Sequence, residues 1–254
     1  MVSTPHMNPA TEGLPAKLLD ALRNARHVTV LTGSGISAES GVPTFRDAQT
    51  GLWSKFKPEE LATPEAFQRN PKLVWEWYAW RRELVTLARP NPGHLALVEL
   101  EKGVPQFTLV TQNVDGLHQR AGSRNVIELH GNITRTKCFA EGTVVENWED
   151  TGDVPPRCPF CGALLRPDVV WFSEILPQDA LERAVQASRD CDVFFSIGTS
   201  TQVYPAAALP WEALDTGAVV VEINPNPTFL TRRATFVLHG PSGVTLPQVI
   251  RQLW

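Results

Sequence analysis

Apolar residues gather in four short runs that are rich in β-branched side chains, and each run ends in small polar residues. Runs of about five such residues are typical of strands that are buried on both faces of a parallel sheet. They occupy residues 28–32, 107–111, 193–197 and 219–223. Apolar residues at helical spacing lie before or between these runs, at residues 17–25, 94–100 and 178–188. The alternation predicts an α/β fold with a doubly wound, Rossmann-like parallel sheet.

Small and polar residues stand at the carboxyl end of every predicted strand, where ligands of such sheets bind. They are Gly33, Ser34 and Gly35, then Gln112 and Asn113, then Gly198, Thr199 and Ser200, and finally Asn224. Turn formation alone would explain any single strand end. Because all four ends share this character, we expect one ligand crevice that the four loops build together.

Two segments interrupt the α/β pattern and predict a second, smaller lobe. Residues 47–88 form a helical, Trp-rich insert, and residues 136–167 form a zinc-ribbon-like insert that contains three of the four cysteines. The remaining segments form the larger lobe, which contains the predicted Rossmann-like sheet, and the start of the chain is expected to be flexible. These segments are residues 17–46, 89–135 and 168–254 for the lobe and residues 1–16 for the flexible start.

The composition fits a folded protein and argues against several functional classes. Of the 254 residues, 43% are hydrophobic and 20% are charged, which is too apolar for a disordered chain. The net charge of -4 argues against a protein that binds nucleic acid by broad neutralisation of phosphates. No apolar run approaches the ~20 residues that span a bilayer, and no secretory signal is recognisable. We expect a cytoplasmic protein that contacts neither membranes nor nucleic acids directly, with a monomer as the default state.

A glycine-rich loop follows the first predicted strand. Residues 33–38 match the G-x-G-x-x-G/A pattern, in which glycines let the backbone approach a pyrophosphate. In a nicotinamide dehydrogenase, the helix after this loop leads to a second strand and an acidic residue that binds the ribose. Here Gly41 and Pro43 interrupt the helix, and residues 50–60 contain no strand pattern. The loop therefore indicates a dinucleotide site but argues against hydride transfer.

Three cysteines have the spacing of a zinc ribbon. Cys138 is separated from the pair Cys158 and Cys161 by a loop of the expected length, and Glu141 holds the place of a fourth ligand. Two alternatives stay open: a site of three thiolates and one carboxylate, or a degenerate site that binds metal weakly or not at all. No histidine accompanies the cysteines, so a bound zinc would be structural. Cys191 begins a predicted strand, and we expect it to be a buried core thiol.

Five motifs occur in order along the chain. They are Gly33 to Arg46, Thr111 to Asp115 with Leu117 and His118, His130 with Gly131, Arg166 and Pro167 with Val169 to Phe172, and Gly198 to Ser200 with Val203. In this combination they resemble the motifs of the sirtuins, the NAD-dependent protein-lysine deacylases, over about residues 17–254. Three positions depart from the family pattern: Ser34 replaces Ala, Ser173 replaces Gly and Glu141 replaces Cys. Of the three, only Glu141 stands at a position expected to coordinate zinc.

The resemblance implies an NAD site and a catalytic base. Sirtuins cleave the nicotinamide–ribose bond of NAD and transfer the lysine acyl group to the ribose, which releases nicotinamide and O-acyl-ADP-ribose. His130 and Asn113 would be catalytic, with His130 as general base on a ribose hydroxyl. The implied NAD-binding residues are Gly33, Ser34, Gly35, Ile36, Ser37, Phe45, Arg46, Trp53, Gln112, Asn113, Val114, Asp115, Gly198, Thr199, Ser200, Asn224 and Ser242.

The resemblance also implies how an acyl-lysine peptide is bound and which acyl group is read. Val169, Val170, Trp171 and Phe172 would pair with the substrate backbone and wall the acyl-lysine tunnel. Tyr78 and Arg81 lie three residues apart on a predicted helix, as does the pair that reads the acyl carboxylate in desuccinylating and demalonylating sirtuins. The alternative is that Tyr78 packs with Trp75, Trp77 and Trp80 while Arg81 faces solvent.

Three other functions compete with deacylation. Mono-ADP-ribosyl transfer uses the same cleavage of NAD with a different acceptor and remains the main alternative. A dehydrogenase is disfavoured by the interrupted helix after the glycine loop. A pure binding module is disfavoured by the polar residues at all four strand ends.

Overall fold

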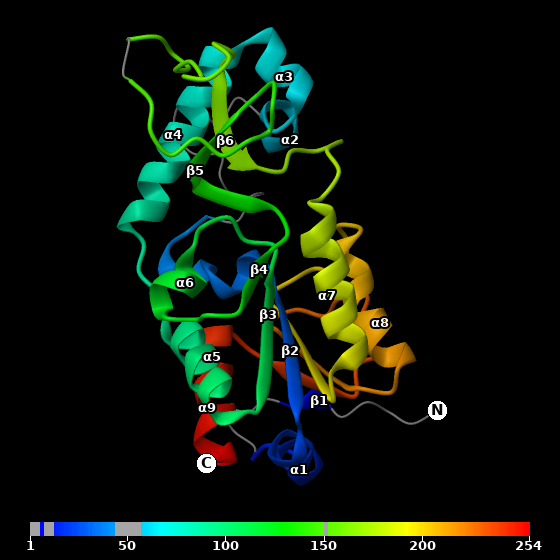
Figure 1. The fold of residues 1–254 in the computed structure, drawn as a ribbon. Coiled ribbons are helices and arrows are strands. Elements are labelled where there is room, and N and C mark those ends of the chain that lie inside the picture. The colour runs from blue at the N-terminus through cyan, green and yellow to red at the C-terminus, as the bar shows by residue number, and fades with distance from the viewer. Residues whose placement is uncertain (1–5, 8–12, 44–56, 150–151) are drawn as a thin grey trace.

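The computed structural model describes residues 6–7, 13–43, 57–149 and 152–254, and these form two lobes (Figure 1). The larger lobe is built on a parallel sheet with the strand order β1-β9-β8-β7-β2-β3-β4. Its strands are β1 (His6–Met7), β2 (His27–Thr32), β3 (Gln106–Thr111), β4 (Val126–Glu128), β7 (Val193–Ile197), β8 (Val219–Asn224) and β9 (Phe236–His239). The parallel order confirms the predicted fold class.

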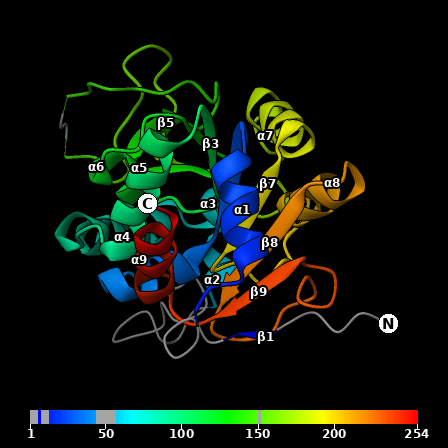
Figure 2. The same cartoon turned by 90° about the horizontal axis from the view of Figure 1, so that it is seen from below.

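Helices cover both faces of this sheet, as a doubly wound fold requires (Figure 2). One face packs against α1 (Ala16–Asn24), α5 (Pro92–Gly103) and α9 (Ser242–Leu253), and the other against α7 (Gln178–Asp190) and α8 (Leu209–Asp215). Successive residues of β2 serve the two sides, because Val30 joins the first core cluster and Leu31 joins the second. The central strands are therefore apolar on both faces, and this is why their runs were recognisable in the sequence.

The smaller lobe consists of a helical layer and a two-stranded hairpin. It contains α2 (Pro58–Leu61), α3 (Pro64–Arg69), α4 (Pro71–Leu87) and the antiparallel pair β5 (Gly131–Cys138) and β6 (Leu165–Val169). The side chains of Thr63 and Asn70 cap α3 and α4, each accepting a backbone N–H bond of 3.1 Å. Aromatic residues that include Phe67, Trp77 and Trp171 fill the space between the helices and the hairpin.

The described parts of residues 1–16 lie against the larger lobe. Strand β1 pairs with β9, and the buried Leu14 donates its backbone N–H to Gln252 over 3.1 Å. The hairpin strands β5 and β6 run across the positions 135/136 and 167/168 at which the sequence pattern divides the lobes. Among the helices that the structure describes, none combines the length and apolar character needed to cross a membrane.

Two buried histidines meet beneath the carboxyl end of β2. The rings of His94 and His118 lie 4.9 Å apart, centroid to centroid, and both are almost fully shielded from water. His94 Nδ1 accepts the Asn91 backbone N–H over 3.3 Å, and His118 Nε2 bonds to the Thr32 hydroxyl over 2.9 Å. Burial lowers the pKa of His94 to about 4, and burial together with His94 places the pKa of His118 well below its ordinary value. Both rings are therefore neutral at pH 7.

We predict that His94 makes the fold sensitive to acid. The unfolded chain binds a proton at this residue below about pH 6.5, whereas the folded chain binds it only near pH 4. As the pH is lowered from about 6.5 toward 4, this site alone should therefore reduce the free energy of unfolding by about 1.4 kcal/mol per pH unit. The variant His94→Gln keeps a side-chain acceptor for the helix cap and removes the titration. Denaturant unfolding between about pH 7.5 and about pH 5 should give a shallower pH slope for the variant. An identical slope in both proteins would contradict the prediction.

Candidate active site

The carboxyl ends of β2, β3, β7 and β8 lie side by side and are joined by hydrogen bonds, and we call this polar site the crevice, after the ligand crevice that the sequence pattern predicts. The chain leaves β2 through two 3-10 turns, Ser34–Ile36 and Ala38–Ser40, and Gly41 then adopts a left-handed φ of 75°. No α-helix follows the glycine loop within residues 33–43, so this described stretch lacks the helix that a dehydrogenase would use.

The glycines of the loop are required because two backbones touch. The Gly35 N–H donates to the Gly198 carbonyl over 2.9 Å, which joins the loop after β2 to the loop after β7. A Cβ on Gly35 would lie 2.6 Å from Gly198 Cα, and a Cβ on Gly33 would lie 2.7 Å from Gly198 O. Neither distance is possible for a side-chain carbon. The three glycines therefore hold the loops of non-consecutive strands in contact at the rim of the crevice.

Asn113 lies at the centre of the crevice and connects three predicted site residues. Its side-chain amide donates to the Gly33 carbonyl and to the Ser37 hydroxyl, both over 3.1 Å. The Ser37 hydroxyl in turn donates to the Asp115 carboxylate over 2.7 Å. Burial raises the pKa of Asp115, and hydrogen bonds from the Leu117 N–H and Ser37 oppose that rise. The polar groups are thus fixed in place before any ligand binds.

The remaining strand ends join the same network. Gln112 donates to the Thr199 hydroxyl over 2.9 Å, and Asn224 donates to the Thr199 carbonyl over 3.0 Å. Ser242 begins α9, and its hydroxyl approaches Glu39 to 3.4 Å. Three further residues of the predicted NAD set lie outside the described residues: Phe45, Arg46 and Trp53.

His130 stands where the crevice meets the small lobe. Its Nδ1 lies 2.9 Å from the Gln112 carbonyl oxygen, and because a carbonyl only accepts, Nδ1 carries the proton. Nε2 is then the basic nitrogen. Burial lowers the pKa of His130, although the Gln112 bond opposes this, so the ring is neutral at pH 7. These are the properties of a general base.

The segment predicted to bind the substrate backbone is tied to His130. The Val170 N–H donates to the His130 carbonyl over 2.9 Å, and the Phe172 N–H donates to the Ala62 carbonyl over 2.9 Å. Residues 169–172 therefore lie between His130 and the helical layer. Val169 and Trp171 are buried, whereas Phe172 is exposed.

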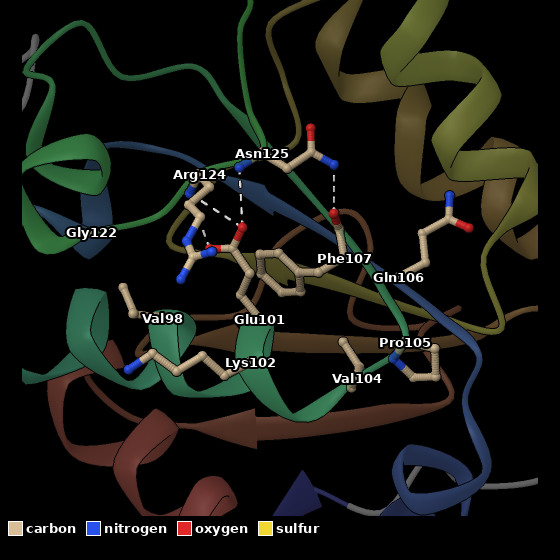
Figure 3. Close-up of a pocket in the computed structure, with 10 residues that line it drawn as sticks. All are labelled: Val98, Glu101, Lys102, Val104, Pro105, Gln106, Phe107, Gly122, Arg124 and Asn125. Carbon is tan, nitrogen blue, oxygen red and sulfur yellow. Dashed lines mark hydrogen bonds between the residues drawn. The ribbon is translucent and has the colours of Figure 1, made fainter.

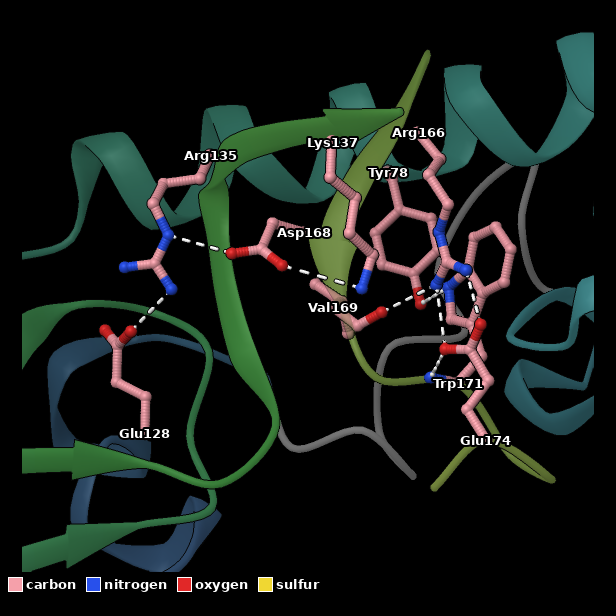
Figure 4. Close-up of polar contacts among 9 residues, drawn as sticks. All are labelled: Tyr78, Glu128, Arg135, Lys137, Arg166, Asp168, Val169, Trp171 and Glu174. Carbon is pink, nitrogen blue, oxygen red and sulfur yellow. Dashed lines mark hydrogen bonds and ion pairs between the residues drawn. The ribbon is translucent and has the colours of Figure 1, made fainter. Parts of the chain in front are cut away.

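A row of charges braces the hairpin beside this segment (Figure 4). The Arg135 guanidinium contacts Glu128 over 2.6 Å and Asp168 over 2.9 Å, and Lys137 lies 3.5 Å from Asp168. Glu128 ends β4 two residues before His130, so the row links the segment that carries His130 to β6. Sequence reasoning missed these residues, because their pairing depends on the register of β5 against β6.

Tyr78 and Arg81 share one side of α4, and the structure supports part of each interpretation. Tyr78 is buried and packs edge-on against Trp77, with ring centroids 4.7 Å apart. The Arg81 guanidinium lies 4.9 Å from the Trp77 ring centroid and 5.8 Å from that of Tyr78. The pair therefore lies together, as a carboxylate clamp requires, while Tyr78 also joins the aromatic packing.

Comparisons with known proteins place the chain in a family. The model of the family described as "Sir2 family" matches residues 33–205, more than half of the chain. This chain belongs to the Sir2 family. The NAD-dependent protein deacylase of Aquifex aeolicus is 59% identical over 226 residues, covering 88% of this chain and 93% of that protein. The NAD-dependent protein deacylase of Ralstonia nicotianae is 51% identical over 236 residues, covering 93% and 96%.

Solved Sir2 structures share the whole fold. A Sir2 homologue in complex with NAD superposes with a TM-score of 0.88 at 45% identity, covering 98% of this chain and 96% of that one. A Sir2 protein bound to a p53 peptide and NAD+ superposes with a TM-score of 0.80 at 33% identity, covering 93% and 97%.

Three thiols of this Sir2 protein converge at the tip of the hairpin. The Sγ atoms of Cys138, Cys158 and Cys161 lie within 4.8 Å of one another, and those of Cys138 and Cys161 are 3.5 Å apart. Burial opposes ionisation of Cys158, but backbone N–H groups of residues 160 and 161 outweigh it and lower the pKa of that thiol. The donor set and its spacing fit a structural zinc. Cys191 is a buried thiol, as expected, and burial raises its pKa to about 11.

The two cysteine turns have the same backbone geometry, which bears on Glu141. The N–H groups of Gly142 and Gly162 donate to the carbonyls of Cys138 and Cys158, both over 2.9 Å. Both glycines have positive φ, 68° and 73°. Glu141 thus holds the place in the first turn that Cys161 holds in the second. Its side chain is exposed and does not belong to the thiol cluster, so its role as fourth ligand stays a prediction.

A separate cavity of about 540 Å³ lies at the other end of the sheet (Figure 3). It is lined by the start of β3, the end of α5 and residues 122–125, and it contains none of the predicted site residues. There the Glu101 carboxylate accepts the N–H groups of Arg124 and Asn125, which fastens this loop to α5. The cavity lies at the amino end of the strands and is distinct from the crevice.

We predict that Glu141 completes the zinc site. Glu141→Ala should lower zinc affinity, and Glu141→Cys should raise it at least about tenfold, since thiolate is the preferred ligand. Zinc retention during competition with a chelator, followed by elemental analysis and the thermal unfolding midpoint, measures both effects. Glu146→Ala removes an exposed carboxylate from the same insert and serves as the matched control. Equal retention by wild type and Glu141→Ala would exclude the carboxylate as a ligand.

Proposed function

We propose that this chain is an NAD-dependent protein-lysine deacylase, and that His130 is its general base. The observation that carries this proposal is the double attachment of His130. Its ring is oriented by the Gln112 carbonyl at the nucleotide crevice, and its own carbonyl holds Val170 in the peptide-binding segment. One residue thus borders both the NAD site and the acyl-lysine site.

The relatives support the same activity. Curated proteins that are 51–59% identical over most of the chain are named NAD-dependent protein deacylase. Sir2 structures are described in complex with NAD, with 2'-O-acetyl ADP-ribose and with a p53 peptide. NAD and acyl-lysine peptides are therefore the substrates we assign to this chain. Its free thiols suit a reducing compartment, and we propose the cytoplasm.

Bound NAD would supply the ribose acceptor and the nicotinamide leaving group. In our proposal the glycine loop and the ends of β3, β7 and β8 bind the dinucleotide, with Asn113 and Asp115 beside the reacting ribose. His130 Nε2 takes the proton of a ribose hydroxyl, and the bond to the Gln112 carbonyl stabilises the protonated ring. Zinc would stabilise the hairpin and take no part in the chemistry.

We further propose that the enzyme removes succinyl and malonyl groups in addition to acetyl groups. Arg81 would neutralise the acyl carboxylate and the Tyr78 hydroxyl would donate a hydrogen bond to it. Two facts support this assignment: both residues lie on one side of α4, and Tyr78 contacts Trp171 of the peptide-binding segment. The Arg81 charge lies among apolar rings, where its attraction for a carboxylate is screened less than in open water.

The direct test is turnover of matched acetyl-, malonyl- and succinyl-lysine peptides with NAD, with the products identified by mass spectrometry. We expect nicotinamide and O-acyl-ADP-ribose, and His130→Ala should lower kcat by roughly 10²–10⁴-fold. The pKa of His130 lies below the ordinary 6.5, so kcat/KM should be constant near pH 7. It should fall only at a lower pH, where His130 becomes protonated. An ADP-ribosylated protein in place of O-acyl-ADP-ribose would instead identify a mono-ADP-ribosyltransferase.

The acyl preference is tested by Arg81→Met. Activity on succinyl-lysine should fall by at least about a hundredfold, as expected for a lost charge-assisted pair, while acetyl-lysine activity falls far less. Arg183→Met, an exposed arginine on α7, is the control and should change neither rate. Equal losses on the two acyl groups would rule out Arg81 as the carboxylate reader.

A further inference from the structure

Trp171 connects the peptide-binding segment to the helix that carries Tyr78 (Figure 4). Only 2% of its surface is exposed. The indole Nε1 donates to the Tyr78 hydroxyl oxygen over 3.0 Å, across 93 residues of sequence. At its other end, the Trp171 backbone N–H donates to the Glu174 carboxylate over 2.7 Å.

An ion pair between the buried Arg166 and the partly exposed Glu174 fixes the position of this indole. The Arg166 guanidinium stacks 3.3 Å from the Trp171 ring centroid, and Arg166 is itself only 3% exposed. Arg166 also pairs with Glu174 and donates to the Val169 carbonyl over 2.7 Å. These bonds bind the two ends of residues 166–174 together. The indole is therefore held by its stacking partner on one face and by its own backbone turn.

The direction of the Trp171–Tyr78 bond determines what the phenol can do next. An indole N–H only donates, so the Tyr78 oxygen is the acceptor in this bond. Its own proton is not used there and stays available for another acceptor. Burial raises the pKa of Tyr78 to about 12, so the phenol keeps that proton across the physiological range. Arg81 lies over the Tyr78 ring, on the side of α4 where an anionic acyl group would be recognised.

We propose that Trp171 is a positioning residue for acyl selectivity: its indole N–H holds the Tyr78 hydroxyl oxygen so that the phenol proton points to the carboxylate of a succinyl or malonyl group. This inference rests on the proposed desuccinylase and demalonylase function. It adds a specificity element that belongs to the peptide-binding segment instead of the α4 helix. Acetyl-lysine carries no carboxylate, so it gains nothing from the orientation.

The test compares Trp171→Phe with wild type on acetyl- and succinyl-lysine in one peptide sequence. Phenylalanine keeps an aromatic ring against Arg166 and removes only the indole part with its N–H. The KM for succinyl-lysine should rise by about tenfold, the effect of one lost hydrogen bond, with a several-fold smaller change for acetyl-lysine. Tyr78→Phe should produce the same selective loss. The double variant should have the same KM for succinyl-lysine as Tyr78→Phe alone, because both changes remove the same oriented hydrogen bond from the phenol to the carboxylate.

Each outcome bears on a different step. Equal KM changes for the two acyl groups, or additive losses in the double variant, overturn the role of Trp171 even if Arg81→Met behaves as expected. A wild-type enzyme that removes acetyl but not succinyl groups overturns the proposed desuccinylase and demalonylase function together with this inference. Trp211→Phe, a tryptophan on α8 outside the site, controls for loss of an indole and should leave both KM values unchanged. Thermal unfolding and calorimetric binding of the acetyl peptide report whether Trp171→Phe is folded.

Discussion

The contact between the Gly35 and Gly198 backbones is the constraint on which the crevice depends. It joins the loops of two adjacent parallel strands through residues that are 163 positions apart in sequence, and a single methyl group at either side would separate them. Once these loops touch, the Asn113 amide reaches the Ser37 hydroxyl and the Gln112 amide reaches the Thr199 hydroxyl. The polar site is thus a result of how closely two backbones approach, and its side chains then consolidate the arrangement.

The hairpin of β5 and β6 connects this crevice to the small lobe. Strand β5 starts beside His130, ends at the first zinc-ligating cysteine, and is braced against β6 by the Arg135 and Asp168 charges. Strand β6 then leads directly into the peptide-binding segment. His130, residues 169–172 and the cysteine turns therefore all adjoin one two-stranded ribbon, and the position of each depends on the register of that ribbon.

Much of this arrangement could be read from the sequence, for identifiable reasons. Strands β2, β3, β7 and β8 are buried on both faces, so their apolar runs stand out, and their polar ends predicted the crevice. Strands β4 and β9 have only three and four residues, too short for a recognisable pattern. The bond from Trp171 to Tyr78 and the row from Glu128 to Lys137 were not predictable, because they depend on tertiary contacts between distant segments. Position 141 was predictable from spacing alone, but whether its carboxylate turns toward the thiols depends on the metal.

The placement of the cysteine turns has a consequence for how tightly a metal can be held. Strand β5 lies between the cysteine turns and His130, so a ligand can be exchanged at the tip without disturbing groups in the crevice. How firmly a metal is held can therefore be set at position 141, where Glu stands in place of the Cys of the family pattern. Metal retention becomes a separately adjustable property, set at one end of a strand whose other end adjoins His130.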